Sequence, residues 1–292
     1  MKPAPFEYAD PHNLSDVVSL LEKHEGEAKV LSGGQSLMPL LNMRLARPEL
    51  LIDLAKVPDL DYIREVEGKL AIGAMTRQRS VEFSPLIRER YPLVHAATMH
   101  IAHPQNRNQG TVGGSLAHAD PAAEYPAMAL ALDAEFRAFG RAGERVIPAS
   151  EFFVTYLTTA LESNEVLTEV RLPPLSERAG WSFIELARRH GDFALAGVVA
   201  TIELDGGGRC TEARLVLFGV GSTPIRAGAA ESALKGAKPD ERLCADVARK
   251  ASEDLEEPLS DVHASAAYRR DLARVLTRRA LLEAAARAGG GN

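Results

Sequence analysis

The stretch Leu31-Ser32-Gly33-Gly34-Gln35-Ser36 contains a Gly-Gly pair between a predicted strand and a predicted helix. Residues 28–31 lead into it as a short apolar run, which predicts a buried strand, and the apolar residues 37–45 after it are typical of a helix. Paired glycines let a backbone adopt positive φ and approach a ligand closely. Successive N–H groups in such a turn form an anion-binding nest that needs no lysine. The hydroxyl groups of the two serines would add hydrogen-bond donors.

A second stretch repeats this pattern, Gln109-Gly110-Thr111-Val112-Gly113-Gly114-Ser115. It lies inside the polar segment 102–121, which we expect to be a long structured loop, since loops of that length are usually functional or disordered. Two nests suit a pyrophosphate better than a single phosphate. A Gly-Gly pair is equally compatible with a tight turn, and the residues alone leave both interpretations open.

Composition excludes several classes of protein. The 292 residues carry a net charge of −6, so there is no basic excess for nucleic acid. Two cysteines, Cys210 and Cys244, are too few for an iron–sulfur cluster or a disulfide framework. No apolar run approaches the roughly 18 residues of a membrane span. Residues 1–5 lack the apolar core of a secretory signal, and we expect a cytoplasmic protein.

Apolar patterning divides the chain at a Pro-rich linker, residues 173–178. We predict one domain at 1–176 and another at 177–292. Before the linker, Asn13 or Ser15 would cap a first helix. Further elements expected there are strands at 50–54 and 70–73, a helix at 81–101 interrupted near Pro92, a helix at 122–134, a hairpin at 134–147 and an alternating strand at 165–172.

Beyond the linker, three strand-like runs are expected at 181–186, 195–204 and 210–218. Two helices are expected to follow, at 240–255 and 265–286. The second would bury one face made of Tyr268, Leu272, Val275, Leu276 and Leu282.

Several other polar groups have two interpretations. His95, His100, His103 and His118 match no metal-ligand spacing and are expected to be loop or helix-surface residues. Asp120 and Glu124 could bond the hydroxyls of a sugar, or Asp120 could cap a helix that starts at Pro121. Residues 188–193 are a charged turn, or a loop that brings Phe193 against a flat ligand. The chain has no Rossmann fingerprint, P-loop or nucleophile elbow.

Three motifs together resemble a known family. Residues 32–45, residues 111–115 with 120–126, and residues 188–194 are similar to motifs of the FAD-binding medium subunits of molybdenum hydroxylases. These are the carbon monoxide dehydrogenase and xanthine dehydrogenase type enzymes. The similarity runs from about Pro5 to Ala286 with the motifs in the expected order.

The resemblance implies an α+β fold. Residues 1–176 would be the two-part FAD-binding domain of the vanillyl-alcohol-oxidase (PCMH) type. Residues 177–292 would be a C-terminal domain of the CO dehydrogenase flavoprotein type, with a three-stranded antiparallel sheet and a helical bundle. The resemblance also implies an electron-transfer oxidoreductase subunit that receives electrons from [2Fe-2S] clusters of a small subunit and passes them through FAD to an external acceptor.

The implied partners are that small subunit and a large subunit with the molybdenum cofactor, assembled as a dimer of heterotrimers. By resemblance, no catalytic residue and no metal ligand belong to this chain. Gln35 stands where some flavoproteins of the wider fold carry a histidine bonded to FAD, so we expect non-covalent FAD. The implied FAD-binding residues are Ser32, Gly33, Gly34, Gln35, Ser36, Leu37, Ile101, Thr111, Gly113, Gly114, Ser115, Glu124, Leu167 and Phe193.

Within that set the resemblance implies different roles. The two loops would hold the pyrophosphate, and Glu124 would contact the ribose or nearby groups. Ile101, Leu167 and Phe193 would lie near the flavin. Phe193 stands where some relatives carry tyrosine, so it keeps the stacking surface and loses the hydroxyl. The alternatives are a scaffold subunit that has lost flavin and a stand-alone flavin oxidoreductase.

Overall fold

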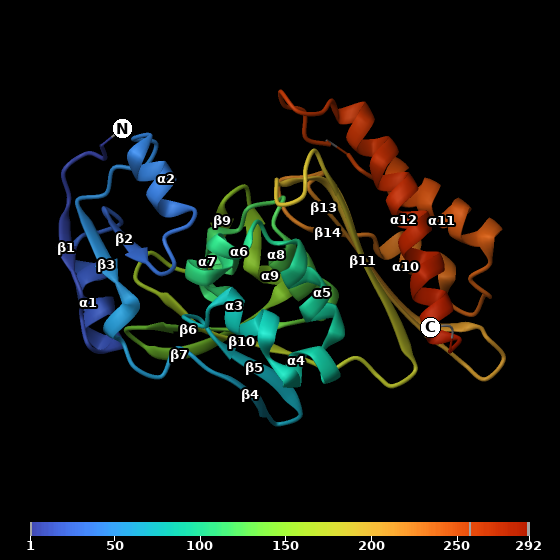
Figure 1. The fold of residues 1–292 in the computed structure, drawn as a ribbon, viewed down its shortest axis with the longest axis horizontal. Helices are drawn as coiled ribbons and strands as arrows, with labels where there is room; N and C mark the ends of the chain where they lie inside the picture. Colours follow the sequence, from blue (N-terminus) through green and yellow to red (C-terminus); the bar gives the residue numbers. More distant parts are fainter. Residues whose placement is uncertain (1, 257, 291–292) are drawn as a thin grey trace. The chain divides into compact units, whose positions relative to one another are not determined.

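Two larger sheets and the two-stranded pair of residues 153–155 and 158–159 build the first of two structural units. The computed structural model describes residues 2–256 and 258–290, and its ribbon is drawn in Figure 1. The first unit runs through Ile87 and includes His103–Ala119 and Asp133–Pro173. The second comprises Arg88–Ala102, Asp120–Leu132 and the chain from Pro174 onward. The predicted sequence boundary after residue 176 stays a prediction.

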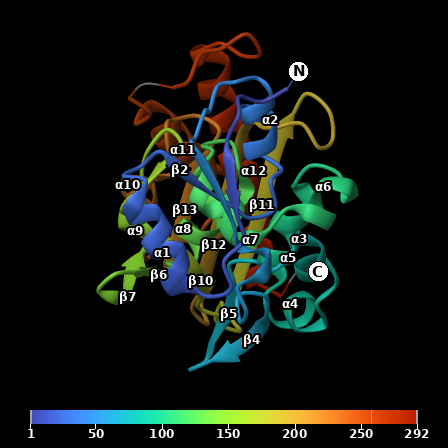
Figure 2. The ribbon, with the colours of Figure 1, turned by 90° about the vertical axis from the view of Figure 1, so that its left-hand side faces the viewer.

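A three-stranded parallel sheet carries the first glycine loop. Its strands are ordered β1 (Glu7–Ala9), β3 (Leu50–Asp53) and β2 (Ala28–Leu31), and Figure 2 views the molecule from their side. Helix α1 (Leu14–Lys23) packs Val17 and Leu21 into a core with Ile52. Asn13 caps α1 by accepting a hydrogen bond from the N–H of Asp16 at 2.8 Å, which confirms one of the two predicted caps.

The second sheet of this unit has five antiparallel strands. They are ordered β4 (Ile63–Val66), β5 (Lys69–Gly73), β10 (Val166–Leu172), β6 (Glu135–Gly140) and β7 (Gly143–Pro148). The hairpin β6–β7 confirms the predicted one. The predicted alternation of β10 is wrong, because every residue except Arg171 is buried. The unit also contains η1 (Leu54–Lys56), α2 (Leu37–Asn42), α3 (Gln78–Phe83), α6 (Pro104–Gln109), α7 (Val112–His118), α9 (Ala149–Phe152), β8 (Phe153–Thr155) and β9 (Thr158–Thr159).

The expected long loop at 102–121 is wrong, because α6 and α7 occupy most of it. Pro104 begins α6, and Thr111 caps α7 through its hydroxyl. The predicted helix at 81–101 is three helices, α3, α4 (Pro85–Arg90) and α5 (Pro92–His100). Both breaks fall at prolines, Pro85 and Pro92, since proline fits the first turn of a helix and interrupts its interior, and the predicted interruption near Pro92 is confirmed.

The second unit is built on a long antiparallel sheet. Strands β11 (Ala179–Ala187), β12 (Ala194–Leu204) and β13 (Cys210–Phe218) confirm the three predicted runs, and β14 (Ile225–Arg226) adds a short edge. Helices α10 (Gly228–Leu234), α11 (Glu241–Glu253) and α12 (Ala266–Ala288) pack on one face (Figure 1). Helices α5 and α8 (Glu124–Ala131) also belong to this unit and contact the sheet.

The predicted buried face of α12 is wrong in part. Leu276 is buried, but Tyr268 is 47% exposed and Val275 is 37% exposed. The helix approaches β11 so closely that a Cβ at Gly180 would lie 1.9 Å from the carbonyl oxygen of Ala284. Such a contact requires a small residue at Ala284, so the buried face of α12 combines alanines with Leu276 and Leu281.

Asp120 does not cap α8. Its Oδ1 accepts a hydrogen bond from the N–H of Ala122 at 2.8 Å, and the helix begins later, at Glu124. The residue therefore stabilises the turn that precedes the helix.

Candidate functional site

The two glycine loops meet in the first unit. The hydroxyl oxygens of Ser32 and Thr111 lie 2.6 Å apart, and the Ser32 hydroxyl also donates to Sδ of Met75 at 2.9 Å. A Cβ at Gly33 would lie 2.3 Å from the carbonyl oxygen of Gln109 and 3.0 Å from the nitrogen of Thr111. Glycine is therefore needed at this position for the loops to pack on each other, whatever they bind.

The first loop presents open hydrogen-bond donors. Among the described residues, the backbone N–H groups of 33–36 find no acceptor. Gly34 has φ +70°, a conformation that glycine adopts without strain. The Gly34 carbonyl accepts from the N–H of Met38 at 3.0 Å, which leads the chain into α2. This loop therefore has the properties of an anion nest.

The second loop is not such a nest, which corrects the interpretation of two equivalent loops. The N–H of Val112 donates to the carbonyl of Thr76, and that of Gly113 to the carbonyl of Ala74, both at 2.9 Å. The N–H of Gly114 donates to the Thr111 hydroxyl at 3.1 Å. A Cβ at Gly113 would lie 2.4 Å from Cβ of Ala74. This loop is a platform fixed to the strand end at residues 73–76.

Hydrogen bonds and a buried ion pair hold the second loop in place. Arg77 donates to the carbonyl of Gln109, and the N–H of Gln78 donates to the carbonyl of Gly110 at 2.9 Å. The buried Arg107 of α6 pairs with Glu82 of α3 through Nε and Oε2 at 2.9 Å. Burial alone would raise the pKa of Glu82, but hydrogen bonds from Arg107 and Arg79 hold it below its usual value.

The remaining candidates of the first unit lie around these loops. Leu37 is the first residue of α2. Leu167 is 4% exposed on β10, at an irregularity of its pairing with β6. Gln35 accepts a hydrogen bond from Nδ2 of Asn106 at 3.2 Å, and its own amide donates to the carbonyl of Gly33. The structure thus brings residues 32–37 and 111–115 together in one place.

Three predicted site residues belong to the second unit. Ile101 follows α5 and is 8% exposed, and Glu124 is buried at the start of α8. Phe193 is 69% exposed in the β11–β12 connection. Near Ile101, the imidazole of His100 pairs with Glu185 of β11. Sequence spacing gave no signal for this pair, because its members come from distant parts of the chain.

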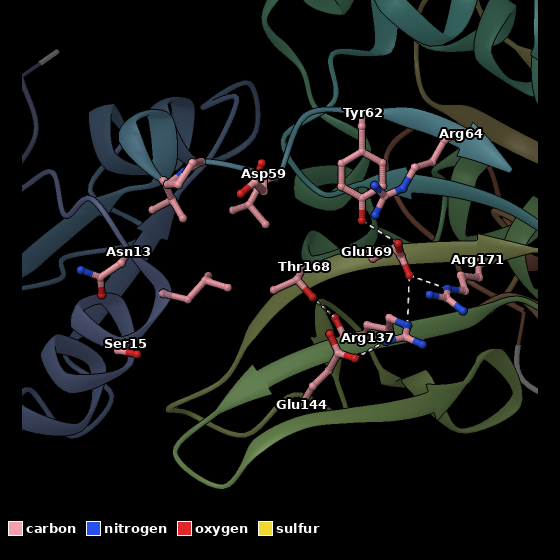
Figure 3. A pocket seen from close by; sticks show the side chains of 14 residues that line it. Asn13, Ser15, Asp59, Tyr62, Arg64, Arg137, Glu144, Thr168, Glu169 and Arg171 are labelled. Atoms are coloured by element: carbon pink, nitrogen blue, oxygen red, sulfur yellow. Dashed lines mark hydrogen bonds and ion pairs between the residues drawn. The ribbon is translucent and has the colours of Figure 1, made fainter. Parts of the chain in front are cut away.

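A charged cavity of about 410 Å³ in the first unit is distinct from the loops (Figure 3). Glu169 lines it, accepts a hydrogen bond from the hydroxyl of Tyr62 at 2.6 Å and pairs with Arg137 and Arg171. Burial, together with the hydrogen bond to Glu169, raises the pKa of Tyr62 to about 12. Glu169 is thus paired with two arginines, so this charged cluster is explained by ion pairs within the protein.

Other kinds of site find no support in the described ranges. No group of three or more His, Cys, Asp or Glu side chains in residues 2–256 and 258–290 could hold a metal ion. Cys210 and Cys244 are both buried, and burial raises the pKa of Cys244 to about 11. No helix of the described chain is long and apolar enough to cross a membrane.

Family models match both parts of the chain. The model described as "FAD binding domain in molybdopterin dehydrogenase" matches residues 4–175. The model described as "CO dehydrogenase flavoprotein C-terminal domain" matches residues 181–284.

Individual relatives match over nearly their full length. The chain is 42% identical over 288 residues to the 6-hydroxypseudooxynicotine dehydrogenase complex subunit alpha of Paenarthrobacter nicotinovorans, covering 99% of this chain and 97% of the relative. It is 38% identical over 287 residues to the carbon monoxide dehydrogenase medium chain of Hydrogenophaga pseudoflava, covering 98% and 99%. A solved structure of carbon monoxide dehydrogenase from that organism gives a TM-score of 0.95 at 39% identity, covering 98% of this chain and 99% of that chain.

Proposed function

Because the chain belongs to the FAD-binding subunits of molybdenum-containing dehydrogenases, a family of oxidoreductases, we propose that its first glycine loop binds the pyrophosphate of FAD. The observation that carries the proposal is the row of four N–H groups at residues 33–36 that find no acceptor in the described part of the chain. Backbone donors of this kind bind phosphate oxygens without a basic side chain.

The residues present fit such a group. A diphosphate accepts hydrogen bonds through several oxygens, and the loop offers consecutive donors with no side chain at Gly33 and Gly34 to obstruct approach. Thr111 and Ser115 would add hydroxyl groups from the platform. Gln35 has no nucleophilic ring nitrogen, and its side chain already accepts a hydrogen bond from Asn106. Both facts support non-covalent attachment of FAD. Ile101, Glu124, Leu167 and Phe193 stay predictions from the resemblance.

FAD, when bound, supplies a redox group that can exchange electrons singly or in pairs, which no side chain of this protein can do. The chain's own contribution is to bind, orient and shield that group. No acid, base or nucleophile in the two glycine loops points to substrate chemistry there. We therefore propose an electron-transfer subunit, with substrate hydroxylation assigned to a partner.

The proposed partners are a large subunit with the molybdenum cofactor and a small subunit with [2Fe-2S] clusters, in a dimer of heterotrimers. Relatives named as a medium chain and as a subunit of a dehydrogenase complex support a multi-subunit assembly. An external acceptor would then receive the electrons from FAD. Co-purification from the native host, followed by measurement of mass and subunit ratio, tests this arrangement.

The decisive test identifies the bound chromophore. The chain, purified with its native partners, is denatured and precipitated, and the supernatant is analysed by mass spectrometry. We expect about one FAD per chain in the supernatant. Flavin that stays with the precipitated protein would contradict non-covalent attachment. A folded assembly without any flavin would favour the scaffold alternative.

A further inference from the structure

A chain of hydroxyl groups connects the two glycine loops to a sulfur atom. The N–H of Gly114 donates to the hydroxyl oxygen of Thr111 at 3.1 Å, and this oxygen lies 2.6 Å from that of Ser32. The Ser32 hydroxyl donates to Sδ of Met75 at 2.9 Å. A serine hydroxyl has a single hydrogen, so Thr111 is the donor to Ser32. Met75 is therefore the last acceptor of the chain.

A thioether is a weak acceptor for this position. Its sulfur accepts hydrogen bonds less well than an oxygen atom does. Hydrogen bonds in a chain polarise and strengthen one another, so a change at the last acceptor also alters the bond between Ser32 and Thr111. The contact between the two loops thus depends on the chemical state of one sulfur atom.

The surrounding structure holds Met75 in place. Its N–H donates to the carbonyl of Leu60 at 2.7 Å, and its side chain belongs to the same hydrophobic cluster as Leu54 and Val57. Both ends of the residue are therefore fixed by contacts within the first unit. A change at the sulfur is consequently met by movement of Ser32 rather than of Met75 itself.

A cavity gives small molecules access to this residue. Met75 is 8% exposed and lines a cavity of about 580 Å³ in the first unit, together with Leu54, Leu60 and Arg77. A water molecule occupies only about 30 Å³ in the liquid. A reagent of similar size, such as hydrogen peroxide, can therefore enter the cavity, whereas the exposure of Met75 is too small for contact with another protein.

We propose that Met75 is a site of oxidation by hydrogen peroxide, and that its oxidation weakens FAD binding by the first glycine loop; this inference rests on the proposed function. A lone pair of Sδ attacks one peroxide oxygen, so the S–O bond forms while the O–O bond breaks. The proton of the transferred oxygen passes to the departing hydroxide, which leaves as water. The sulfur loses two electrons and becomes a sulfoxide, and the peroxide gains them.

The product is a different partner for Ser32. A sulfoxide is polar, and its oxygen is a stronger acceptor than the thioether sulfur. Because Sδ already lies 2.9 Å from the Ser32 oxygen, the added oxygen forces the hydroxyl to move, which draws Ser32 away from Thr111. Loss of one hydrogen bond between the loops corresponds to FAD binding that is about 10-fold weaker. Sulfoxide reductases restore the thioether, so the change is reversible.

The test follows FAD affinity and methionine oxidation in the same samples. The full chain is treated with hydrogen peroxide as wild type, as Met75→Leu and as Met38→Leu. Met38 is the matched control, because it is 36% exposed and its N–H donates to the carbonyl of Gly34 in the first loop. Peptide mass spectrometry locates the added oxygen, and titration with FAD gives the affinity before and after treatment.

We expect the affinity of the wild type and of Met38→Leu to fall about 10-fold as Met75 gains oxygen. Met75→Leu begins with weaker binding, since Ser32 has lost its acceptor, and peroxide should weaken it no further. Leucine and methionine have similar volumes, so this variant should fold. Treatment of the oxidised wild type with both methionine sulfoxide reductases, one for each epimer, should restore the thioether and the affinity together.

Four results would overturn the inference. These are an equal effect of peroxide on Met75→Leu, protection by Met38→Leu, a wild type that keeps full affinity with Met75 oxidised, and a Met75 that stays unoxidised while Met38 is oxidised. If Met75→Leu does not fold, the reductase experiment decides, because affinity that stays low after Met75 is reduced would also contradict the inference. A wild type that binds no FAD before treatment would instead refute the proposed function.

Discussion

The two glycine loops have similar sequences and opposite hydrogen-bonding states. Both combine a Gly-Gly pair with flanking hydroxyl residues, at 32–36 and 111–115. In the first, the described structure gives four successive N–H groups no acceptor. In the second, the N–H groups of Val112, Gly113 and Gly114 all donate within the protein.

This difference separates two uses of glycine that a sequence motif cannot distinguish. Gly34 is needed for its positive φ, which turns the backbone so that its donors are exposed. Gly113 is needed because Ala74 occupies the space of a side chain. The first loop is therefore suited to hold a ligand, and the second to hold the first loop in place through the Ser32–Thr111 contact.

The largest effect on function is expected from Gly114→Val. A Cβ there would lie 2.7 Å from the Thr111 hydroxyl oxygen and 3.6 Å from that of Ser32, so a bulky residue would separate the loops. We expect a folded chain that retains no FAD. The ratio of flavin to protein absorbance after gel filtration measures this. Full flavin content would show that the contact between the loops is not needed for binding.

The largest effect on stability is expected from Gly113→Ala. Its Cβ would lie 2.4 Å from Cβ of Ala74 and 2.7 Å from backbone atoms, which cannot move without disturbing β5. We expect a loss of about 2–3 kcal/mol in the free energy of unfolding, measured in urea. Gly228→Ala is the control, because nothing lies within 4 Å of its Cβ position. Equal stability of the two variants would refute the platform role.

Much of the fold follows from local signals in the sequence. Asn13 and Ser265 cap helices through their side chains. The hairpin turn at residues 205–208 joins two strands that the sequence shows as apolar runs. The helices α6 and α7 were not predicted, because α6 is short and polar, α7 is short and contains two glycines, and neither shows hydrophobic periodicity. The buried face of α12 was predicted wrongly in part, because its close approach to Gly180 requires a small residue at Ala284, which hydrophobic periodicity does not reveal.

The site could be predicted only in part. The residue types of the two loops are compatible with phosphate binding and with tight turns, and the structure brings both loops together. Which N–H groups are open could not be predicted, since the acceptors for the second loop, Thr76 and Ala74, come from another segment. The pairing of His100 with Glu185 is likewise a product of tertiary structure.

A smaller effect on FAD binding is expected from Gly34→Ala. Alanine at φ +70° costs about 1 kcal/mol, and the variant should bind FAD about 10-fold more weakly because the donors lose their alignment. Gly26→Ala is the matched control, since Gly26 also has positive φ with nothing within 4 Å. Both variants should lose similar stability, but only the first should lose affinity, measured by titration calorimetry. An equal loss of FAD affinity in both would remove the special role of the first loop.

The smallest effect at neutral pH concerns the support of the platform by Glu82. Hydrogen bonds from Arg107 and Arg79 hold the pKa of Glu82 below its usual value despite burial. A carboxyl whose pKa is lowered in the folded state contributes stability above its unfolded pKa and loses that contribution as the pH falls through the folded pKa. Arg107 lies in α6, just before the second loop.

Acid should therefore loosen the second loop before the first. We expect the hydrogen-exchange protection of the Val112 and Gly113 amides to fall as the pH drops below the ordinary pKa range of a glutamate, while the first loop, whose amides are already open, changes little. In Glu82→Gln this acid step should be absent, because the amide does not titrate. Protection of both amides that persists unchanged to lower pH would mean that the contacts with Thr76 and Ala74 hold the platform without the ion pair.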